Sequence, residues 1–180
     1  AVPGFDADRA VIVAATDSND AWVELLQLQD AVREAGATEI VTVIPYMGYA
    51  RQDEAFEAGA PVSARAMARA ISTGTDRVVV VNPHERSVTD FFDAHVTICD
   101  AAGRLADPLP DDLADPLFLA PDAGAVSLAE ATCAAYGDGE TDYFEKTRQS
   151  GTDVEITPSD AETRDRDVVI VDDIVATGST

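Results

Sequence analysis

The chain has 180 residues, 46% of them hydrophobic, which is enough for one domain or two small domains with a sizeable core. Its 34 acidic residues against 12 basic ones give a formal net charge of −22, which makes nucleic acid and anionic membranes poor partners. Lysine occurs once, at Lys146, and the other basic residues are arginine. This acidic excess either serves to keep the protein soluble or is an adaptation to high salt, where ions screen the repulsion between the acidic residues.

The cysteines and the apolar runs bear on the compartment. Cys99 and Cys133 form no motif with each other, which is typical of reduced thiols. No apolar stretch approaches the ~20 residues that span a membrane. The start of the chain lacks the basic residues and the long apolar run of a signal peptide. We expect a cytoplasmic protein without a membrane partner.

Short β-branched runs alternate with helical patterns along the chain. Strands are predicted over 10–16, 39–44, 77–81, 95–99, 116–120, 142–145 and 167–173. Helices are predicted over 20–36, with Ser18 or Asp20 as N-cap, over 61–74 and over 125–136. Most of the strands are apolar throughout, as in parallel sheets that are covered on both faces. The pattern predicts an α/β fold with doubly wound, mainly parallel sheets.

Five of the predicted strands run into unusual polar segments. These segments are 45–56, 82–87, 121–126, 146–151 and 172–180. Ligands of doubly wound sheets bind outside the carboxyl ends of the strands, so a single parallel sheet would place all five segments along one edge. The segment 101–116, rich in Pro, Asp and Ala, has the composition of a passage between two lobes.

The strongest single motif is "VVIVDDIVATGST" (168–180). Its small residues let backbone N–H groups surround a phosphate, and its hydroxyls add donors. The carboxylates of Asp172 and Asp173 can accept hydrogen bonds from a sugar diol or face a metal ion. The competing interpretation is a turn with a helix N-cap, which the apolar strand and the paired carboxylates disfavour. The motif predicts a site for a phosphorylated sugar.

With the segments "PYMGYARQD" (45–53), "PVSARAMARAI" (61–71), "PHERSVTDFF" (83–92), "PDAG" (121–124) and "EKTR" (145–148), this loop resembles the ribose-phosphate diphosphokinase family. The resemblance covers nearly the whole chain and is nearest to archaeal, in particular haloarchaeal, members. Four positions depart from the family pattern: Asn82 replaces Asp, Pro83 replaces Leu, Ala125 replaces Gly, and Ser179 replaces Gly. The Asn82 change puts one carboxylate near the metal in doubt.

The resemblance implies a type I phosphoribosyltransferase-like fold with two similar lobes. Residues 1–99 would form an ATP-binding lobe and residues 100–180 a lobe that binds ribose 5-phosphate. Such enzymes transfer the diphosphoryl group of ATP to the 1-hydroxyl of ribose 5-phosphate and release AMP. They use Mg²⁺, and the resemblance implies a homo-oligomer of at least two subunits.

The resemblance also implies roles for individual residues. It assigns catalysis to Lys146 and Arg148; ATP binding to Arg51, Gln52, Asp53 and His84; ribose 5-phosphate binding to Arg148, Asp172, Asp173, Ala176, Thr177, Gly178, Ser179 and Thr180; and Mg²⁺ binding to His84 and Asp122. Lysine is a compact point charge, and arginine is a rigid fork. A reaction that needs the former explains why Lys146 persists where lysine is otherwise absent. The segment after Arg148, rich in Ser, Gly and Thr, is expected to be a mobile loop that closes over substrate.

Several simpler or competing interpretations remain open at this point. Asp122 could serve only as a helix cap. A base-using phosphoribosyltransferase would share the phosphate loop, and a non-catalytic regulator would share most of the sequence. The family also carries a Phe-x-Asp-Gly-Glu element before the first strand and a helix after the phosphate loop. We therefore expect the chain to be the middle of a longer enzyme, incomplete in both lobes.

Overall fold

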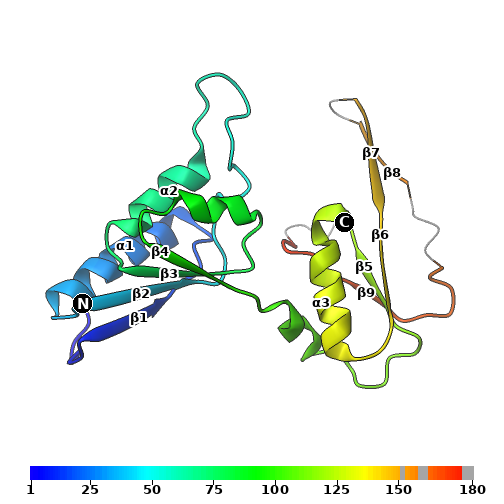
Figure 1. The fold of residues 1–180 in the computed structure, drawn as a ribbon, viewed down its shortest axis with the longest axis horizontal. Helices are drawn as coiled ribbons and strands as arrows, with labels where there is room; N and C mark the ends of the chain where they lie inside the picture. Colours follow the sequence, from blue (N-terminus) through cyan, green and yellow to red (C-terminus); the bar gives the residue numbers. More distant parts are fainter. Residues whose placement is uncertain (151–152, 158–161, 176–180) are drawn as a thin grey trace. The chain divides into compact units, whose positions relative to one another are not determined.

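The computed structural model describes residues 1–150, 153–157 and 162–175. The chain divides into two compact units, Ala1–Asp100 and Ala101–Thr180, which we call the first and the second unit (Figure 1). Within the described residues, no helix is both long and apolar enough to cross a membrane.

The first unit is built on a four-stranded parallel sheet. Its strands, in the order β1-β2-β3-β4, are β1 (Arg9–Val13), β2 (Glu39–Ile44), β3 (Arg77–Val81) and β4 (His95–Cys99). They are connected by α1 (Asn19–Glu34), α2 (Ser63–Ser72) and the 3-10 helix η1 (Arg86–Phe91). The bounds of β2, β3 and β4 are those predicted from the sequence, whereas β1 ends three residues earlier than predicted. Of the two predicted N-cap candidates, Ser18 caps α1, because its Oγ accepts a hydrogen bond from the Ala21 N–H at 3.2 Å, and Asp20 lies in the first turn.

The core of the first unit lies on one face of its sheet. Alternate strand residues such as Ile40, Ile44 and Val78 are fully buried, together with one side of α1, α2 and η1. Consecutive strands take consecutive positions, so right-handed crossovers bring all the connecting helices to the same face. On the other face, Val11 and Val13 are 60% and 66% exposed. In the described residues this sheet is therefore covered on one face.

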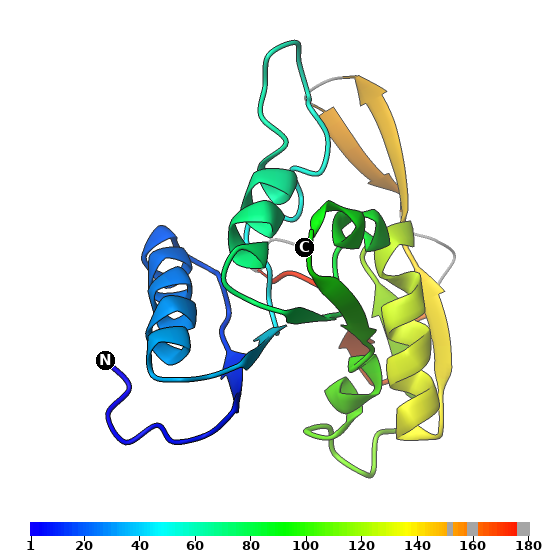
Figure 2. The same cartoon turned by 60° about the vertical axis from the view of Figure 1, so that its left-hand side comes forward.

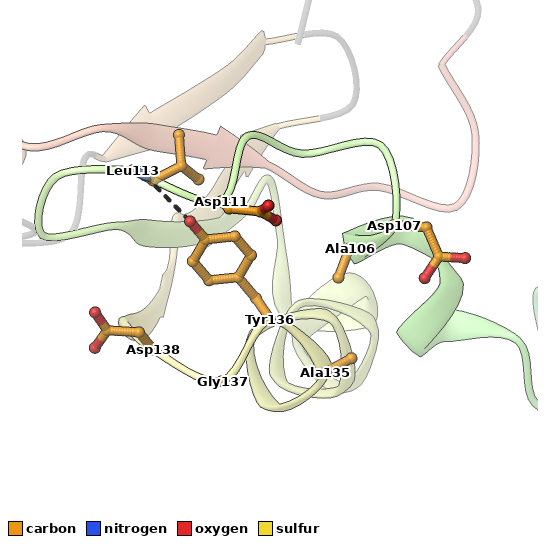
Figure 3. A pocket seen from close by; sticks show the side chains of 8 residues that line it. All are labelled: Ala106, Asp107, Asp111, Leu113, Ala135, Tyr136, Gly137 and Asp138. Carbon is orange, nitrogen blue, oxygen red and sulfur yellow. Dashed lines mark hydrogen bonds between the residues drawn. The ribbon is translucent and has the colours of Figure 1, made fainter.

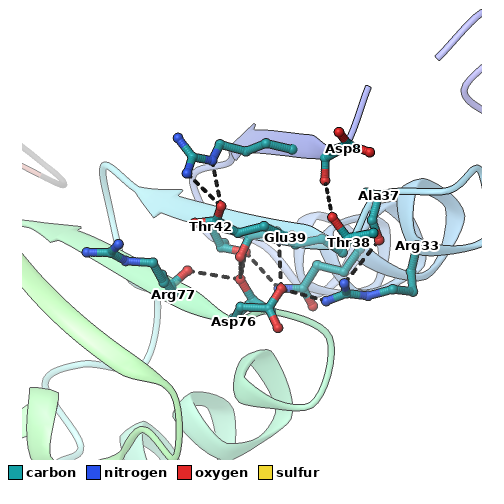
Figure 4. Close-up of polar contacts among 12 residues, drawn as sticks. Asp8, Arg33, Ala37, Thr38, Glu39, Thr42, Asp76 and Arg77 are labelled. Atoms are coloured by element: carbon teal, nitrogen blue, oxygen red, sulfur yellow. Dashed lines mark hydrogen bonds and ion pairs between the residues drawn. The ribbon is translucent and has the colours of Figure 1, made fainter. Parts of the chain in front are cut away.

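Polar side chains make hydrogen bonds near the amino ends of these strands, away from the carboxyl edge of the sheet (Figure 4). Gln29 Nε2 donates to Thr42 Oγ1, and Thr42 Oγ1 donates to Thr75 Oγ1, both at 2.9 Å. Directly before β3, Asp76 accepts hydrogen bonds from Arg33 and from the Ile40 N–H, both at 2.7 Å. These contacts tie α1 to β2 and to the start of β3.

The second unit contains a three-stranded parallel sheet in the order β6-β5-β9. The strands are β5 (Leu117–Ala120), β6 (Glu140–Tyr143) and β9 (Val168–Ile170). The helix α3 (Val126–Tyr136) packs on β5, preceded by the 3-10 helices η2 (Ala102–Ala106) and η3 (Ala123–Ala125). All four residues of β5 are buried because this strand is central. The chain passes from β5 to β6 on one side and returns as β9 on the other, so the direction of winding reverses at β5.

An antiparallel hairpin follows β6, visible in Figure 2. It pairs β7 (Glu145–Ser150) with β8 (Asp153–Thr157), with an irregularity between Arg148 and Ser150. The prediction of a loop over this segment is therefore wrong for residues 153–157. "DVEIT" alternates polar and β-branched residues, which favours a strand over the loop that the neighbouring Ser and Gly suggest. The predicted α/β class with mostly parallel sheets is confirmed.

Candidate functional site

The polar segments predicted to share one edge divide between two sheets. Those that follow β2 and β3 lie at the carboxyl edge of the first sheet. Those that follow β5, β6 and β9 belong to the second unit. The expectation of a single edge is wrong because β4 and β5 do not pair, and each unit closes its own sheet.

In the first unit, the loop from β2 to α2 starts in a tight contact with the segment after β1. The buried Thr16 hydroxyl accepts a hydrogen bond from the Gly48 N–H at 3.0 Å and donates to the Tyr46 carbonyl at 3.2 Å. A Cβ at Gly48 would lie 2.1 Å from the Thr16 carbonyl oxygen and 3.2 Å from Trp22 Nε1. Only glycine fits at position 48. No sequence motif indicated Thr16 or Trp22, because these contacts depend on tertiary placement.

Further along this loop, Gln52 is held through three of its atoms. Its N–H donates to the Tyr49 carbonyl at 3.0 Å, and its carbonyl accepts from the Ala64 N–H at 3.1 Å. Its side-chain Oε1 accepts from the Ser63 hydroxyl at 2.5 Å. Gln52 is thus fixed both to its own loop and to the first turn of α2.

The neighbours of Gln52 are less constrained. Arg51 is exposed and Asp53 is half-buried. Among the described residues, no hydrogen bond or ion pair holds the side chain of either one. A guanidinium presented in this way offers five donors to phosphate or a flat face to an aromatic ring. The three predicted residues therefore lie together on one loop, with a fixed amide between two solvent-accessible charges.

The segment after β3 places Asn82 and His84 at the same sheet edge. Asn82 adopts a left-handed backbone conformation with φ 36°. Its Nδ2 donates to Asp100 Oδ1 at 3.0 Å, and its N–H donates to the Cys99 carbonyl at 3.1 Å. His84, two residues further, is exposed. The amide at position 82 thus lies beside a carboxylate that follows β4, a neighbour that the sequence did not reveal.

In the second unit, Asp122 and Asp172 follow two adjacent strands. Leu119 of β5 is paired with Ile170 of β9, so the two strand ends lie next to each other. Asp122 Oδ1 accepts from the Gly124 N–H at 3.0 Å, as expected of a capping residue. Asp172 Oδ1 accepts from the Asp173 N–H at 2.9 Å.

This carboxylate group is electrostatically strained. Burial of the Asp172 carboxyl raises its pKa, and the hydrogen bond to the Asp173 side chain and the charges of Asp173 and Asp122 act in the same direction. The Asp173 backbone N–H opposes the shift but does not cancel it. Hydroxyl donors placed against the Asp172 carboxylate would offset this burial and this repulsion.

Several predicted site residues lie partly or wholly outside the described part of the chain. Lys146 and Arg148 lie in β7, with their Cα atoms paired with those of Ile156 and Val154, but their side chains are not among those described. The loop formed by Ala176, Thr177, Gly178, Ser179 and Thr180 lies outside the described residues. No three His, Cys, Asp or Glu side chains of the described ranges form a group that could hold a metal ion.

A cavity of about 410 Å³ in the second unit lies away from these residues (Figure 3). Tyr136 and Gly137 line it at the C-terminus of α3, whereas Asp122 precedes the other end of that helix. The Tyr136 hydroxyl donates to the Pro110 carbonyl at 2.8 Å and accepts from the Leu113 N–H at 3.1 Å. The tyrosine therefore closes the loop between η2 and β5 and is not part of the candidate site.

Two family descriptions match the chain in tandem. The N-terminal domain of ribose phosphate pyrophosphokinase matches residues 6–74. The phosphoribosyl transferase domain matches residues 90–180.

Individual relatives agree with these matches. Ribose-phosphate pyrophosphokinase from Halobacterium salinarum is 62% identical over 178 residues, which cover 99% of this chain and 63% of that protein. The protein of the same name from Methanosarcina acetivorans is 41% identical over 98% of this chain and 61% of that protein. The crystal structure of phosphoribosylpyrophosphate synthetase from Mycobacterium smegmatis aligns with a TM-score of 0.76 and 27% identity, over 97% of this chain and 59% of that chain. The chain thus spans less than two thirds of the length of these relatives.

Proposed function

From the premise that this chain belongs to the ribose-phosphate pyrophosphokinase family, we propose that the protein transfers the diphosphoryl group of ATP to ribose 5-phosphate. The tandem order of the two matched domains carries this proposal, because a base-using phosphoribosyltransferase would need only the second. The products are 5-phosphoribosyl 1-diphosphate and AMP. We further propose a cytoplasmic homo-oligomer.

In this proposal the first unit binds ATP. The Arg51 guanidinium contacts the nucleotide and the Gln52 side chain hydrogen-bonds the edge of the base. Asp53 and His84 are the other ATP-binding residues. The open side chains of Arg51 and Asp53 beside a fixed Gln52 support this division of roles. A fixed amide suits recognition of a base edge, and a mobile guanidinium suits a flexible phosphate chain.

The second unit binds ribose 5-phosphate. Asp172 and Asp173 accept hydrogen bonds from the ribose hydroxyls, and the segment from Ala176 to Thr180 holds the 5-phosphate. The raised pKa of Asp172 supports this role, because hydroxyl donors would compensate the crowded carboxylates.

Lys146 and Arg148 act on the reacting phosphoryl group. The 1-hydroxyl oxygen forms a bond to the β-phosphorus of ATP. The bond from that phosphorus to the α,β-bridging oxygen breaks, AMP leaves with the bridging oxygen, and the hydroxyl proton is released. Negative charge spreads over the phosphoryl oxygens during this step, and preorganised cations stabilise it. The scarcity of lysine elsewhere in the chain supports a chemical role for Lys146.

Mg²⁺ is the cation that this site would take. Asp122 and Asp172 offer carboxylate oxygens, which Mg²⁺ prefers, and the described side chains alone do not complete a site, so phosphate oxygens and water would supply the remaining ligands. His84 offers nitrogen and would act through water or phosphate. When bound, the ion neutralises charge on the polyphosphate.

The test is AMP release from ATP and ribose 5-phosphate, measured in molar KCl with the protein encoded by the complete gene and with no nucleobase present. Release that depends on both substrates supports the proposal. If no AMP is released, but phosphoribosyl diphosphate is consumed when a nucleobase is added, the protein is a phosphoribosyltransferase instead. Absence of both reactions, in a protein that is folded, would point to a regulatory relative.

A further inference from the structure

The carboxamide of Gln52 has its two ends in different environments. Its Oε1 accepts a hydrogen bond from the hydroxyl of Ser63, the first residue of α2. Its Nε2 makes no hydrogen bond to any residue in the ranges that the structure describes. One end of the amide is therefore committed to the protein and the other is available.

Ser63 is free to serve this purpose because the helix does not use it. The N-cap position of α2 is Val62, which makes no side-chain cap, and the Ala64 N–H is satisfied by the Gln52 carbonyl. A serine at the start of a helix usually hydrogen-bonds the helix backbone. Here the Ser63 hydroxyl donates to the Gln52 side chain, and the next residue, Ala64, donates its N–H to the Gln52 carbonyl. The first turn of α2 therefore binds both the side chain and the backbone of Gln52.

We propose that Ser63 is a positioning residue for base recognition, which sets the Gln52 carboxamide so that its NH₂ group faces the nucleotide. An amide nitrogen has two donors and no acceptor, and an amide oxygen has only acceptors. The nucleobase is then recognised through an unprotonated ring nitrogen, which accepts a hydrogen bond from Gln52 Nε2. This inference rests on the proposed function, because that proposal assigns Gln52 to the ATP site.

The test compares a ligand that carries the nucleoside with one that lacks it. ATP and inorganic tripolyphosphate share the phosphate chain, and only ATP carries ribose and adenine. Binding of each is measured by calorimetry with Mg²⁺ in molar KCl. We expect Ser63→Ala to raise the Kd for ATP about 3- to 10-fold, the cost of one oriented hydrogen bond. The Kd for tripolyphosphate should stay within about twofold, and Ser63→Thr, which keeps the hydroxyl, should restore ATP binding.

A second variant tests the direction of the amide. Gln52→Glu can still accept from Ser63 but presents acceptors to the base, so it should bind ATP more weakly than Ser63→Ala does. Ser127→Ala, an exposed serine in the first turn of α3, is the matched control and should change neither affinity.

Each other result counts against the inference. Equal weakening of both ligands by Ser63→Ala would indicate a displaced loop, and unchanged ATP binding would remove the role of Ser63. Parent-like ATP binding by Gln52→Glu would mean that the amide faces the other way. ATP binding without AMP release would refute the proposed activity and leave this inference standing, whereas a parent protein that does not bind ATP refutes both.

Discussion

The two units place their polar groups at sheet edges in opposite ways. In the first unit, neutral hydrogen bonds fix a loop, one accepted by the Thr16 hydroxyl and one donated by the Ser63 hydroxyl, and the side chains of Arg51 and Asp53 remain accessible to solvent. In the second, burial of the Asp172 carboxyl, together with the neighbouring carboxylates of Asp173 and Asp122, raises the pKa of Asp172. The first arrangement holds a loop in one conformation, which suits recognition of a ligand. The second concentrates negative charge, which suits the binding of cations and hydroxyl groups.

The difference extends to charge and core. Residues 1–100 carry 16 acidic and 7 basic residues, a net charge of −9. Residues 101–180 carry 18 acidic and 5 basic residues, a net charge of −13. Among the residues that the structure describes, the main buried cluster of the second unit is also smaller than that of the first. The stability of the second unit should therefore depend more strongly on salt than that of the first.

The largest effect is expected from Lys146→Ala. Removing one charge-stabilising group typically slows a reaction by about 10²- to 10³-fold, so AMP release should fall by this factor. Lys146→Arg should not restore the rate, because a rigid fork cannot replace a compact ammonium. Arg164→Ala, which removes an exposed cation of the same unit, is the control. More than half of the parent rate in the alanine variant, with circular dichroism unchanged, would contradict the assignment.

Gly48→Ala should act on the first unit alone. The added Cβ would lie 2.1 Å from the Thr16 carbonyl oxygen, so the loop or the segment after β1 must move. Overpacking of this kind costs about 1 to 3 kcal/mol in the free energy of unfolding. Urea titration at constant KCl measures this cost, with Tyr46→Phe as the control that leaves the loop backbone intact. A variant as stable as the parent would show that the contact is not tight.

Salt should act mainly on the second unit. The Debye length falls from ~10 Å at 0.1 M to ~3 Å at 1 M, which screens the self-repulsion of the acidic surface. We expect the Tm to rise by about 5 °C or more between 0.1 and 2 M KCl, which corresponds to roughly 1 kcal/mol for a unit of this size. Hydrogen exchange should slow more in α3 than in α1. A flat or falling Tm would reject adaptation to salt, and equal slowing would reject the contrast between the units.

The smallest effect is expected from Asp76→Asn at the far end of the first sheet. The Arg33 hydrogen bond, followed by the Ile40 N–H, holds the pKa of Asp76 below its ordinary value of 3.8. Both side chains of the ion pair are partly exposed, so its loss should cost only about 0.5 to 1 kcal/mol.

The pH dependence of this small cost has a definite sign. Because the folded state binds the proton less tightly, the stabilisation is present above pH ~3.8 and is lost as the pH falls through the lower, folded-state pKa. Chemical denaturation of parent and variant should therefore converge in acid. Asp30→Asn removes the same charge from an exposed position on α1 and should show no such convergence. A parent–variant difference that stays constant with pH would exclude this linkage.

The contrast between the units also explains which features the sequence could predict. The strands β2, β3 and β4 are short apolar runs with clear breaks, and their bounds were predicted correctly. The strand β8 was missed because Ser and Gly beside it outweighed the alternation of Val154 and Ile156. The pairing of strands into two sheets depends on long-range contacts, and a list of polar segments does not contain them.

The same limit applies to the site. The segments that carry Arg51, Lys146 and Asp172 can be recognised because each motif is continuous in sequence. Thr16 and Ser63 could not be found in this way, because the first contacts a loop about thirty residues away and the second is visible only once α2 begins at it. The roles of the motif residues themselves stay predictions until the substitutions above are made.

The burial of Trp22, whose Nε1 would lie 3.2 Å from a Cβ at Gly48, gives the protein its own optical probe. Trp22 is the single tryptophan of the chain, 5% exposed, and within the described residues its Nε1 has no hydrogen-bond partner. An indole in such surroundings emits at the blue end of its range. Any ligand that shifts the start of the β2–α2 loop would admit water to the ring and move the emission to longer wavelengths. The loop can therefore be followed in real time by fluorescence, without a label and without disturbing the acidic surface.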